Sequence, residues 1–329
     1  MRLRVDDKKN LKSICVVGAG QWGLNHVRTL EDLNCLGGVI DQDIRITEDI
    51  KFKYKNCQVF NSLEDSFSSN FDGYIVATQP STHFKIAKKI IENKKPLLVE
   101  KPLTLNIEDS VQLNELAKEN SVNLMVGHLL LFHPAFRKIK ELIKNGVLGE
   151  VQYIYSNRLN LGRFRADENV FWSFAPHDIS LFNYFFNELP LNISSEGIAI
   201  LQNKIHDTSI TSFKYSKNRM GHIFVSWLHP FKEHRFVIVG SEGMVSFEDS
   251  IENKPLTFYD KKVEFADSVP TPKTGKSYNI EYENKFPLTE ELKYFISKID
   301  SDTLEIANGD SAVDVMKVLD RATKSLMDN

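Results

Sequence analysis

The feature that most constrains the fold is a glycine-rich turn near the start of the chain. Gly18, Gly20 and Gly23 follow the apolar run Ile14–Val17 and precede a segment, 24–33, with apolar residues at helical spacing. In a dinucleotide-binding turn the first glycine lets the strand turn sharply, the second lets the backbone approach a pyrophosphate, and the third lets the helix pack on the strand. The helix N-terminus then faces the phosphates. This pattern predicts a dinucleotide site with contacts from Gly18, Gly20, Gln21, Trp22 and Gly23.

An acidic residue after the second predicted strand favours NAD over NADP. Asp41 follows the run Leu36–Ile40 and stands 18 residues after Gly23, close to the roughly 20 residues typical of the ribose-binding acid. A carboxylate there accepts a hydrogen bond from the ribose 2′-hydroxyl and repels a 2′-phosphate. The alternative is an ordinary residue of the turn, and the nearby Arg45 weakens the preference for NAD. We expect NAD as cofactor, with NADP as the second choice.

Composition indicates a globular protein of two domains. The chain has 329 residues, of which 42% are hydrophobic and 26% charged, with a net charge of −3, which are ordinary values. Its interspersed charges predict neither a nucleic-acid nor a membrane partner. Residues 1–12 lack the apolar segment of a signal peptide, so we expect a cytoplasmic protein. Cys15, Cys35 and Cys57 form no Cys-x-x-Cys pair, which predicts no disulfide and no metal site.

The first part of the chain alternates between strand and helix patterns. This alternation is typical of parallel βαβ units. Helix N-caps are predicted at Ser81 and Asn106. Six strands predict an α/β fold with a doubly wound Rossmann sheet over residues 1–127, and the later strands are placed at 57–60, 73–78, 96–100 and 123–127.

Residues 128–329 follow a different pattern and predict a second, α+β domain. Longer strand-like runs indicate an open, mostly antiparallel sheet. The segment 249–284 is polar and contains three prolines, so it is predicted to be loop or edge structure, and the C-terminal helix can pack back on the first domain. The predicted strands are 151–161, 221–228 and 235–239, with a hairpin turn at 240–243, and the predicted helices are 134–144, 289–299 and 311–326.

A lysine follows the fifth predicted strand directly. Glu100, Lys101 and Pro102 place it at the carboxyl edge of the sheet, where open α/β sheets bind their ligands. Proline biases the residue before it towards an extended conformation, which directs the ammonium group of Lys101 towards the cofactor. The alternative is a solvated surface lysine, the commoner fate of lysines.

The glycine turn, the Glu-Lys-Pro motif and a later histidine together resemble the Gfo/Idh/MocA oxidoreductases over nearly the whole chain. The resemblance implies a Rossmann domain, then a domain that binds substrate and commonly forms the interface of a homodimer or homotetramer. It implies that Lys101 contacts nicotinamide and the substrate hydroxyl, and that Glu100, at the same edge, is also a cofactor contact. The segment 77–83 is similar to a family segment near the nicotinamide, which adds Thr78, Pro80 and His83 as cofactor contacts. Alternatively, His83 is an ordinary residue of a helical first turn.

A second segment, 174–180, resembles the family's catalytic histidine segment, in which the histidine opens a helix. The resemblance makes His177 the general base. An unperturbed histidine has a pKa near 6.5 and suits proton transfer at neutral pH, whereas an unperturbed lysine has a pKa of about 10.4. Lys101 is therefore assigned to orienting the substrate and stabilising the alkoxide. Many family members carry Asp four residues before this histidine, where this chain has Ser173.

Arginines in the predicted second domain indicate an anionic substrate. Arginine makes forked contacts with phosphate or carboxylate. Strand alternation places Arg158 and Asn160 on one face. The alternative is a basic surface loop beside Asp167 and Glu168. The predicted substrate contacts in this region are Arg158, Asn160, Arg163 and Arg165.

Further segments resemble the branch of the family that acts on nucleotide-activated amino sugars, and they add Trp172 and Asp178 to the substrate contacts. The resemblance implies oxidation at C3 of a UDP-N-acetylhexosamine or its uronate for surface polysaccharide synthesis. Trp172 could instead be buried in the core. Three alternatives stay open: a dehydrogenase for inositol or another polyol, a noncatalytic dinucleotide sensor, and a redox-neutral enzyme that uses bound NAD transiently.

Overall fold

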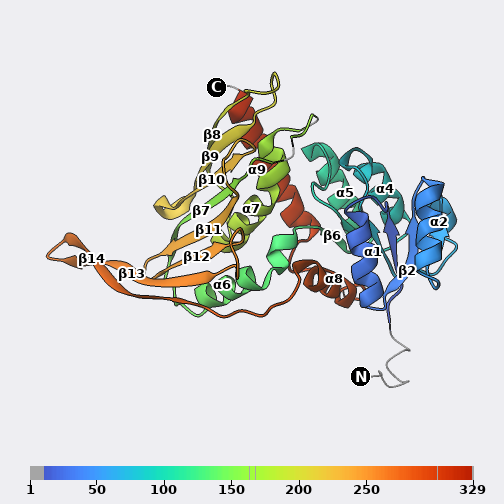
Figure 1. The fold of residues 1–329 in the computed structure, drawn as a ribbon, viewed down its shortest axis with the longest axis horizontal. Helices are drawn as coiled ribbons and strands as arrows, with labels where there is room; N and C mark the ends of the chain where they lie inside the picture. Colours follow the sequence, from blue (N-terminus) through green and yellow to red (C-terminus); the bar gives the residue numbers. More distant parts are fainter. Residues whose placement is uncertain (1–10, 163, 167, 302, 328–329) are drawn as a thin grey trace. The chain divides into compact units, whose positions relative to one another are not determined.

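The computed structural model describes residues 11–162, 164–166, 168–301 and 303–327. The chain forms two compact units (Figure 1). The first comprises Met1–Leu129 and Phe286–Met316, and the second comprises Leu130–Lys285 and Lys317–Asn329. The segment Phe286–Met316, predicted within the second domain, thus returns to the first unit.

The first unit is built on a parallel sheet with strand order β3-β2-β1-β4-β5-β6. This is the doubly wound order, in which β2 and β3 are added on one side of β1, and β4, β5 and β6 are added on the other. The predicted Rossmann fold is therefore confirmed. Its strands are β1 (Ile14–Val17), β2 (Leu36–Ile40), β3 (Gln58–Phe60), β4 (Gly73–Val76), β5 (Leu97–Val99) and β6 (Leu124–Val126).

Both faces of this sheet are buried, as parallel sheets require. Residues 14–17, 73–76 and 97–99 are buried throughout, so each of these strands is a continuous apolar run rather than an alternating one. Helices α4 and α5 pack together, as do α1 and α8. The helices of this unit are α1 (Gly23–Asp32), α2 (Ile44–Lys53), α3 (Leu63–Ser66), α4 (Pro80–Glu92), α5 (Ile107–Glu119), α8 (Pro287–Ser297) and the first part of α9 (Gly309–Met327).

One of the two predicted helix caps is confirmed. The Asn106 side chain accepts a hydrogen bond of 2.8 Å from the Asp109 amide at the start of α5. The cap predicted at Ser81 is wrong, because α4 begins at Pro80 with Gln79 as its N-cap. Proline favours the first helical position, where its missing N–H is not needed.

The second unit contains an eight-stranded sheet of order β14-β13-β12-β11-β7-β10-β9-β8. Only the pairing of β7 with β10 is parallel, so the predicted mostly antiparallel sheet is confirmed. The strands are β7 (Val151–Leu159), β8 (Asn192–Ile198), β9 (Thr208–Lys214), β10 (Met220–Ser226), β11 (Glu233–Gly240), β12 (Met244–Glu248), β13 (Leu256–Ala266) and β14 (Val269–Asn279), and the helices are η2 (Leu129–Phe132), α6 (Pro134–Lys144), α7 (Val170–Phe186) and η3 (Ser216–Asn218).

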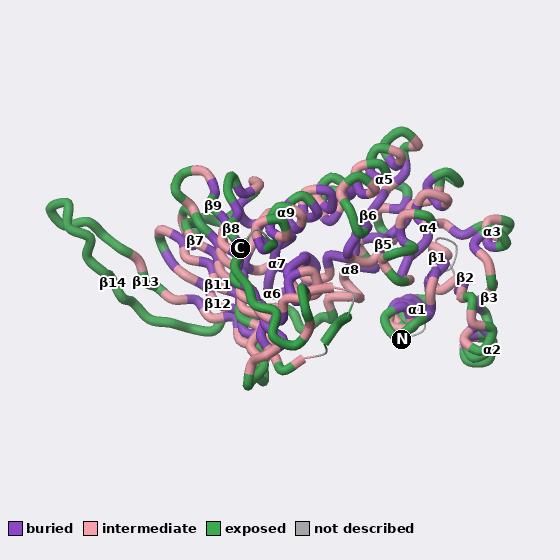
Figure 2. Tube along the Cα trace, turned by 90° about the horizontal axis from the view of Figure 1, so that it is seen from above, coloured by how far each residue is buried: buried purple, intermediate pink, exposed green. Residues whose placement is uncertain are grey.

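Strands β13 and β14 form a long hairpin arm at one edge of this sheet. Figure 2 shows the arm exposed along most of its length. The reading of 249–284 as loop is wrong, whereas its reading as edge structure is confirmed, because β14 is the outermost strand. Pro270 and Pro272 lie on β14, opposite Phe265 and Val263. Prolines are tolerated on such edge strands because no neighbouring strand needs their N–H.

Candidate functional site

The glycine turn between β1 and α1 leaves the backbone open to a ligand. Gly18 has φ of +89°, and a Cβ there would lie 2.7 Å from the Thr78 side chain, so a larger residue does not fit. A Cβ on Gly23 would lie 2.0 Å from the Gly18 carbonyl oxygen. Around Gly20 a Cβ would meet no atom within 4 Å. The close packing and the open backbone at the N-terminus of α1 fit a dinucleotide pyrophosphate.

Asp41 lies at the carboxyl end of β2 and is tied to the glycine turn. Its carboxylate accepts hydrogen bonds from the Ala19 amide at 2.8 Å and the Asp43 amide at 2.9 Å. Arg45 does not face this carboxylate, because its guanidinium binds Asp43 with contacts of 3.0 and 2.6 Å. The positive charge nearest in sequence to Asp41 is thus engaged by another acid.

Glu100 connects the end of β5 to the glycine turn. Its Oε1 accepts a hydrogen bond of 2.5 Å from Trp22 Nε1 and lies 2.7 Å from His26 Nε2. Its Oε2 accepts a hydrogen bond of 3.2 Å from the Lys101 amide. Burial alone would raise the pKa of the Glu100 carboxyl, but His26, Trp22 and Lys101 together hold that pKa below its usual range. An ionised Glu100 therefore fixes the backbone that carries Lys101.

His83 is also placed at this edge, but as a bridge between two loops. The side chain is fully buried. Its Nδ1 lies 2.9 Å from the Pro102 carbonyl oxygen and its Nε2 lies 3.1 Å from the Thr78 carbonyl oxygen. Burial lowers the pKa of the imidazole, against the effect of these two carbonyls. Thr78 and Pro80, the other residues predicted here, are partly exposed at the carboxyl end of β4.

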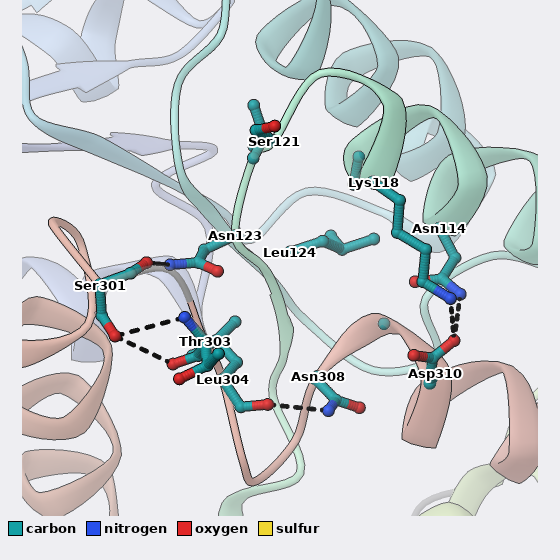
Figure 3. Close-up of a pocket in the computed structure, with 13 residues that line it drawn as sticks. Asn114, Lys118, Ser121, Asn123, Leu124, Ser301, Thr303, Leu304, Asn308 and Asp310 are labelled. Atoms are coloured by element: carbon teal, nitrogen blue, oxygen red, sulfur yellow. Dashed lines mark hydrogen bonds and ion pairs between the residues drawn. The ribbon is translucent and has the colours of Figure 1, made fainter.

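A cavity of the first unit lies at the amino end of β6, away from the carboxyl edge of the sheet. This cavity of about 580 Å³ is lined by the end of α5, the start of β6 and the segment before α9 (Figure 3). Two of its polar side chains are hydrogen-bonded within the lining: Asn114 donates to the Asp310 carboxylate at 2.8 Å, and Asn123 donates to the Ser301 backbone carbonyl at 2.6 Å. Ligands of open α/β sheets bind at the carboxyl edge, so this cavity is not the dinucleotide site.

In the second unit, His177 lies within α7 rather than at its start. The helix begins at Val170, where the Asn169 side chain accepts a hydrogen bond of 3.0 Å from the Trp172 amide. The expectation that His177 opens a helix is therefore wrong, because Pro176 is accommodated inside α7. Ser173 and His177 are four residues apart on this helix and share one face. The His177 side chain is half-buried.

The residue after the histidine anchors α7 to the sheet. Asp178 is fully buried, and its carboxylate accepts hydrogen bonds from Ser156 Oγ at 2.7 Å and Arg158 Nε at 2.5 Å. The Arg158 side chain is only 14% exposed. Sequence reasoning missed Ser156, although its spacing of two from Arg158 on a strand places both on one face. The structure brings Arg158 and Asp178 together in a buried ion pair.

Replacing Asp178 with Asn is expected to lower the free energy of unfolding by about 3 kcal/mol, because removal of one partner leaves a buried charge unpaired. The asparagine oxygen can still accept from Ser156, so the loss reports the pairing with Arg158. Chemical denaturation measures it. The double variant D178N/R158M is expected to recover part of the loss, since the two positions are coupled. Strictly additive losses in the double variant would contradict this account.

The other described residues that were predicted as substrate contacts in the second unit have partners of their own. Trp172 donates its indole N–H to Thr323 Oγ1 at 2.8 Å. Asn160 follows β7, and its backbone N–H donates to the Ser226 carbonyl. Arg165 is exposed, with its Nε 3.6 Å from Glu168. Arg163 lies outside the described residues.

Two further properties of the described residues concern metal ligands and membrane-spanning helices. Over 11–162, 164–166, 168–301 and 303–327, no three His, Cys, Asp or Glu side chains are grouped as metal ligands. In the same part of the chain, no helix combines the length and the apolar character needed to cross a membrane. Cys15, Cys35 and Cys57 are buried free thiols.

Comparison with known families accounts for both units. The model of an oxidoreductase family with an NAD-binding Rossmann fold, GFO/IDH/MocA, matches residues 12–128, and the model of the GFO/IDH/MocA C-terminal domain matches residues 136–246. UDP-N-acetylglucosamine 3-dehydrogenase of Acidithiobacillus ferrooxidans is 26% identical over 190 residues, which cover 57% of this chain and 59% of that enzyme. The scyllo-inositol 2-dehydrogenase (NAD(+)) of Bacillus subtilis is 26% identical over 274 residues, which cover 78% and 79% of the two chains.

Solved structures show the same fold. The A. ferrooxidans UDP-N-acetylglucosamine 3-dehydrogenase superposes with a TM-score of 0.84 at 21% identity, covering 96% of this chain and 98% of that chain. The WlbA dehydrogenase from Bordetella pertussis, in complex with NADH and UDP-GlcNAcA, superposes with a TM-score of 0.78 at 17% identity, covering 97% of each chain. The family models together match more than half of the chain. The protein is therefore a member of the GFO/IDH/MocA family of oxidoreductases.

Proposed function

We propose that the protein is a cytoplasmic, NAD-dependent enzyme that oxidises the C3 hydroxyl of a UDP-N-acetylhexosamine or its uronate to the 3-keto sugar, for surface polysaccharide synthesis. The observation that carries this proposal is the similarity to UDP-N-acetylglucosamine 3-dehydrogenase in both sequence and fold. The structure of the WlbA dehydrogenase, which has the same fold, was solved with UDP-GlcNAcA bound. The exposed Arg165 supports an anionic substrate, because arginine suits diphosphate recognition.

Two residues carry the chemistry in this proposal. Bound NAD supplies the hydride acceptor. His177 takes the proton of the C3 hydroxyl as general base, which suits histidine near neutral pH. Lys101 contacts the same oxygen and stabilises its developing negative charge, since an ammonium group acts as a preorganised electrostatic partner in a site that excludes water. Glu100 keeps the Lys101 backbone in place through its own hydrogen bond.

A polyol dehydrogenase is the second candidate, and the longer match to scyllo-inositol 2-dehydrogenase favours it. The two candidates separate in a substrate panel followed by NADH absorbance. UDP-N-acetylglucosamine, its uronate, free N-acetylglucosamine and scyllo-inositol are compared, with UDP as a competing ligand. Turnover of a UDP sugar that UDP inhibits supports the first candidate. Turnover of inositol alone, unaffected by UDP, refutes it and supports the second.

Asp41 is proposed to select NAD. Replacing it with Asn removes the charge that repels a 2′-phosphate, while the amide oxygen can still accept from the Ala19 amide. The ratio of the Kd for NADP to the Kd for NAD is expected to fall about tenfold, which corresponds to about 1.4 kcal/mol. Adding Asp43→Ser releases Arg45 while keeping a side chain that can cap α2, and should lower the ratio further. Fluorescence titration with both dinucleotides tests this, and an unchanged ratio in both variants would contradict it.

The protein is proposed to form a homodimer or homotetramer through its second unit. The hairpin arm supports this because its two faces differ. One face carries Val263, Phe265, Pro270 and Pro272, which the strand register places opposite one another, and Phe265 is 73% exposed. The other face carries the ion pairs of Glu264 with Lys262 and Lys273. An isolated two-stranded hairpin is marginally stable in water, so a contact on the apolar face would stabilise the arm.

Replacing Phe265 with Glu is expected to weaken association at least about tenfold, because the contact would bury an unpaired charge. Light scattering over a range of protein concentrations measures the effect. Thr271→Glu on the polar face of the arm is the matched control. Equal behaviour of both variants and the wild-type protein would contradict a role for the arm in assembly.

A further inference from the structure

His83 is a buried polar residue whose partners are both backbone carbonyls. It lies in the first turn of α4, it has no exposed surface, and its two ring nitrogens face the oxygens of Thr78 and Pro102 at 3.1 and 2.9 Å. Thr78 follows β4 and Pro102 follows β5, and these two strands are neighbours in the sheet. His83 therefore links the two loops at the carboxyl edge where the dinucleotide site was placed.

The chemistry of this bridge is asymmetric. Both carbonyl oxygens only accept hydrogen bonds, and a neutral imidazole has one N–H to donate. Only the imidazolium form can donate to both. A neutral ring can donate a hydrogen bond to only one of the two carbonyl oxygens, and the shorter contact is the one to Pro102.

The hydrogen bond to Pro102 is important because Lys101 is the residue before it. Lys101 stands between Glu100, which is held by Trp22 and His26, and Pro102, whose carbonyl faces His83. The residues before and after Lys101 are thus each tied to a different part of the first unit. A lysine carries its ammonium group on a flexible stem of four carbons. The position of that group therefore depends on how firmly the backbone of the lysine is held.

We propose that His83 is a positioning residue for Lys101: its Nδ1–H donates to the Pro102 carbonyl and fixes the turn from which the lysine reaches the substrate. This inference rests on the proposed role of Lys101. It differs from the predicted role of His83 as a cofactor contact, in which a ring nitrogen would face the dinucleotide. It also differs from a purely structural role, in which either hydrogen bond would serve equally.

Two substitutions separate the two hydrogen bonds. The amide nitrogen of Asn occupies the place of Nδ1 and can still donate to Pro102, whereas that of Gln occupies the place of Nε2 and can donate only to Thr78. His83→Asn is expected to keep kcat within about threefold of wild type, and His83→Gln and His83→Ala to lose about thirtyfold or more, because small misplacements of a reacting group are costly. The KM for the sugar and the thermal midpoint should be similar in the Asn and Gln variants.

A second readout needs no turnover. Acetylation of Lys101 by an amine-directed reagent, followed by peptide mass spectrometry, reports how firmly the turn is held. The rate should match wild type in His83→Asn and rise in His83→Gln and His83→Ala. Equal rates and equal kcat in the Asn and Gln variants would overturn the inference, as would better retention in the Gln variant. If the wild-type protein oxidises no tested sugar or polyol, the proposed function fails, and the acetylation rates still decide the inference.

Discussion

Replacing Lys101 with Met is expected to lower kcat about a thousandfold, the size of effect seen when a preorganised electrostatic partner is removed from a developing oxyanion. Strand β5 ends at Val99, and Glu100 and Lys101 follow it at the carboxyl edge of a doubly wound sheet. Methionine keeps most of the length of the side chain but cannot stabilise negative charge. The loss should therefore fall on the chemical step.

Binding of the dinucleotide should survive this change. The glycine turn and Asp41 are held by contacts that do not involve the lysine side chain, such as the hydrogen bond from the Ala19 amide. Stopped-flow absorbance of NADH measures kcat, and quenching of protein fluorescence measures the Kd for NAD. Lys51→Met, at an exposed position of α2, is the matched control. A variant of Lys101 that retains wild-type kcat would remove the lysine from the mechanism.

Replacing His177 with Asn is expected to lower kcat by about a thousandfold, within the range for loss of a general base. The imidazole is half-buried within α7, and Asp178 anchors this helix to β7. Asparagine can still hydrogen-bond the substrate hydroxyl but cannot take its proton. The pH dependence is the distinguishing readout: the decline of wild-type kcat towards acid pH should disappear in the variant.

His229→Asn, on the loop after β10, is the control for this prediction, because its ring already faces the Phe231 carbonyl at 2.9 Å. A wild-type pH profile in the His177 variant would assign the general base to another residue. Ser173→Asp adds the acid that many relatives carry one turn earlier. A change in the acid limb of that variant would show that the two side chains interact.

The elements that could be predicted are those whose signal is local. The Rossmann sheet followed from apolar runs alternating with helical spacing, and the glycine turn from three residues in one short segment. Helix α4 begins two residues earlier than the sequence predicts, because serine and proline compete as signals for the same helix start. The hairpin arm was seen only as edge or loop because its prolines interrupt the strand pattern without breaking the ladder.

The contacts that hold the site could not be predicted in the same way, because they join distant segments. Glu100 binds Trp22 across 78 residues of sequence, and Asp178 binds Arg158 across 20. No periodicity reports such a pairing, so Arg158 was assigned to substrate without its buried partner. His83 can be recognised from the sequence as a residue near the cofactor edge, but its two carbonyl partners come from loops that only the folded chain brings together.

Hydride transfer from C3 of a UDP sugar to NAD can be followed with an isotopic label. Purified protein with stoichiometric NAD is mixed in a stopped-flow instrument with UDP-N-acetylglucosamine or its uronate, each carrying hydrogen or deuterium at C3. The expected result is a burst of NADH absorbance in a single turnover, slowed by deuterium, with the label recovered in the reduced dinucleotide by mass spectrometry. A burst with scyllo-inositol and none with either UDP sugar would contradict the claim, as would label that stays in the sugar.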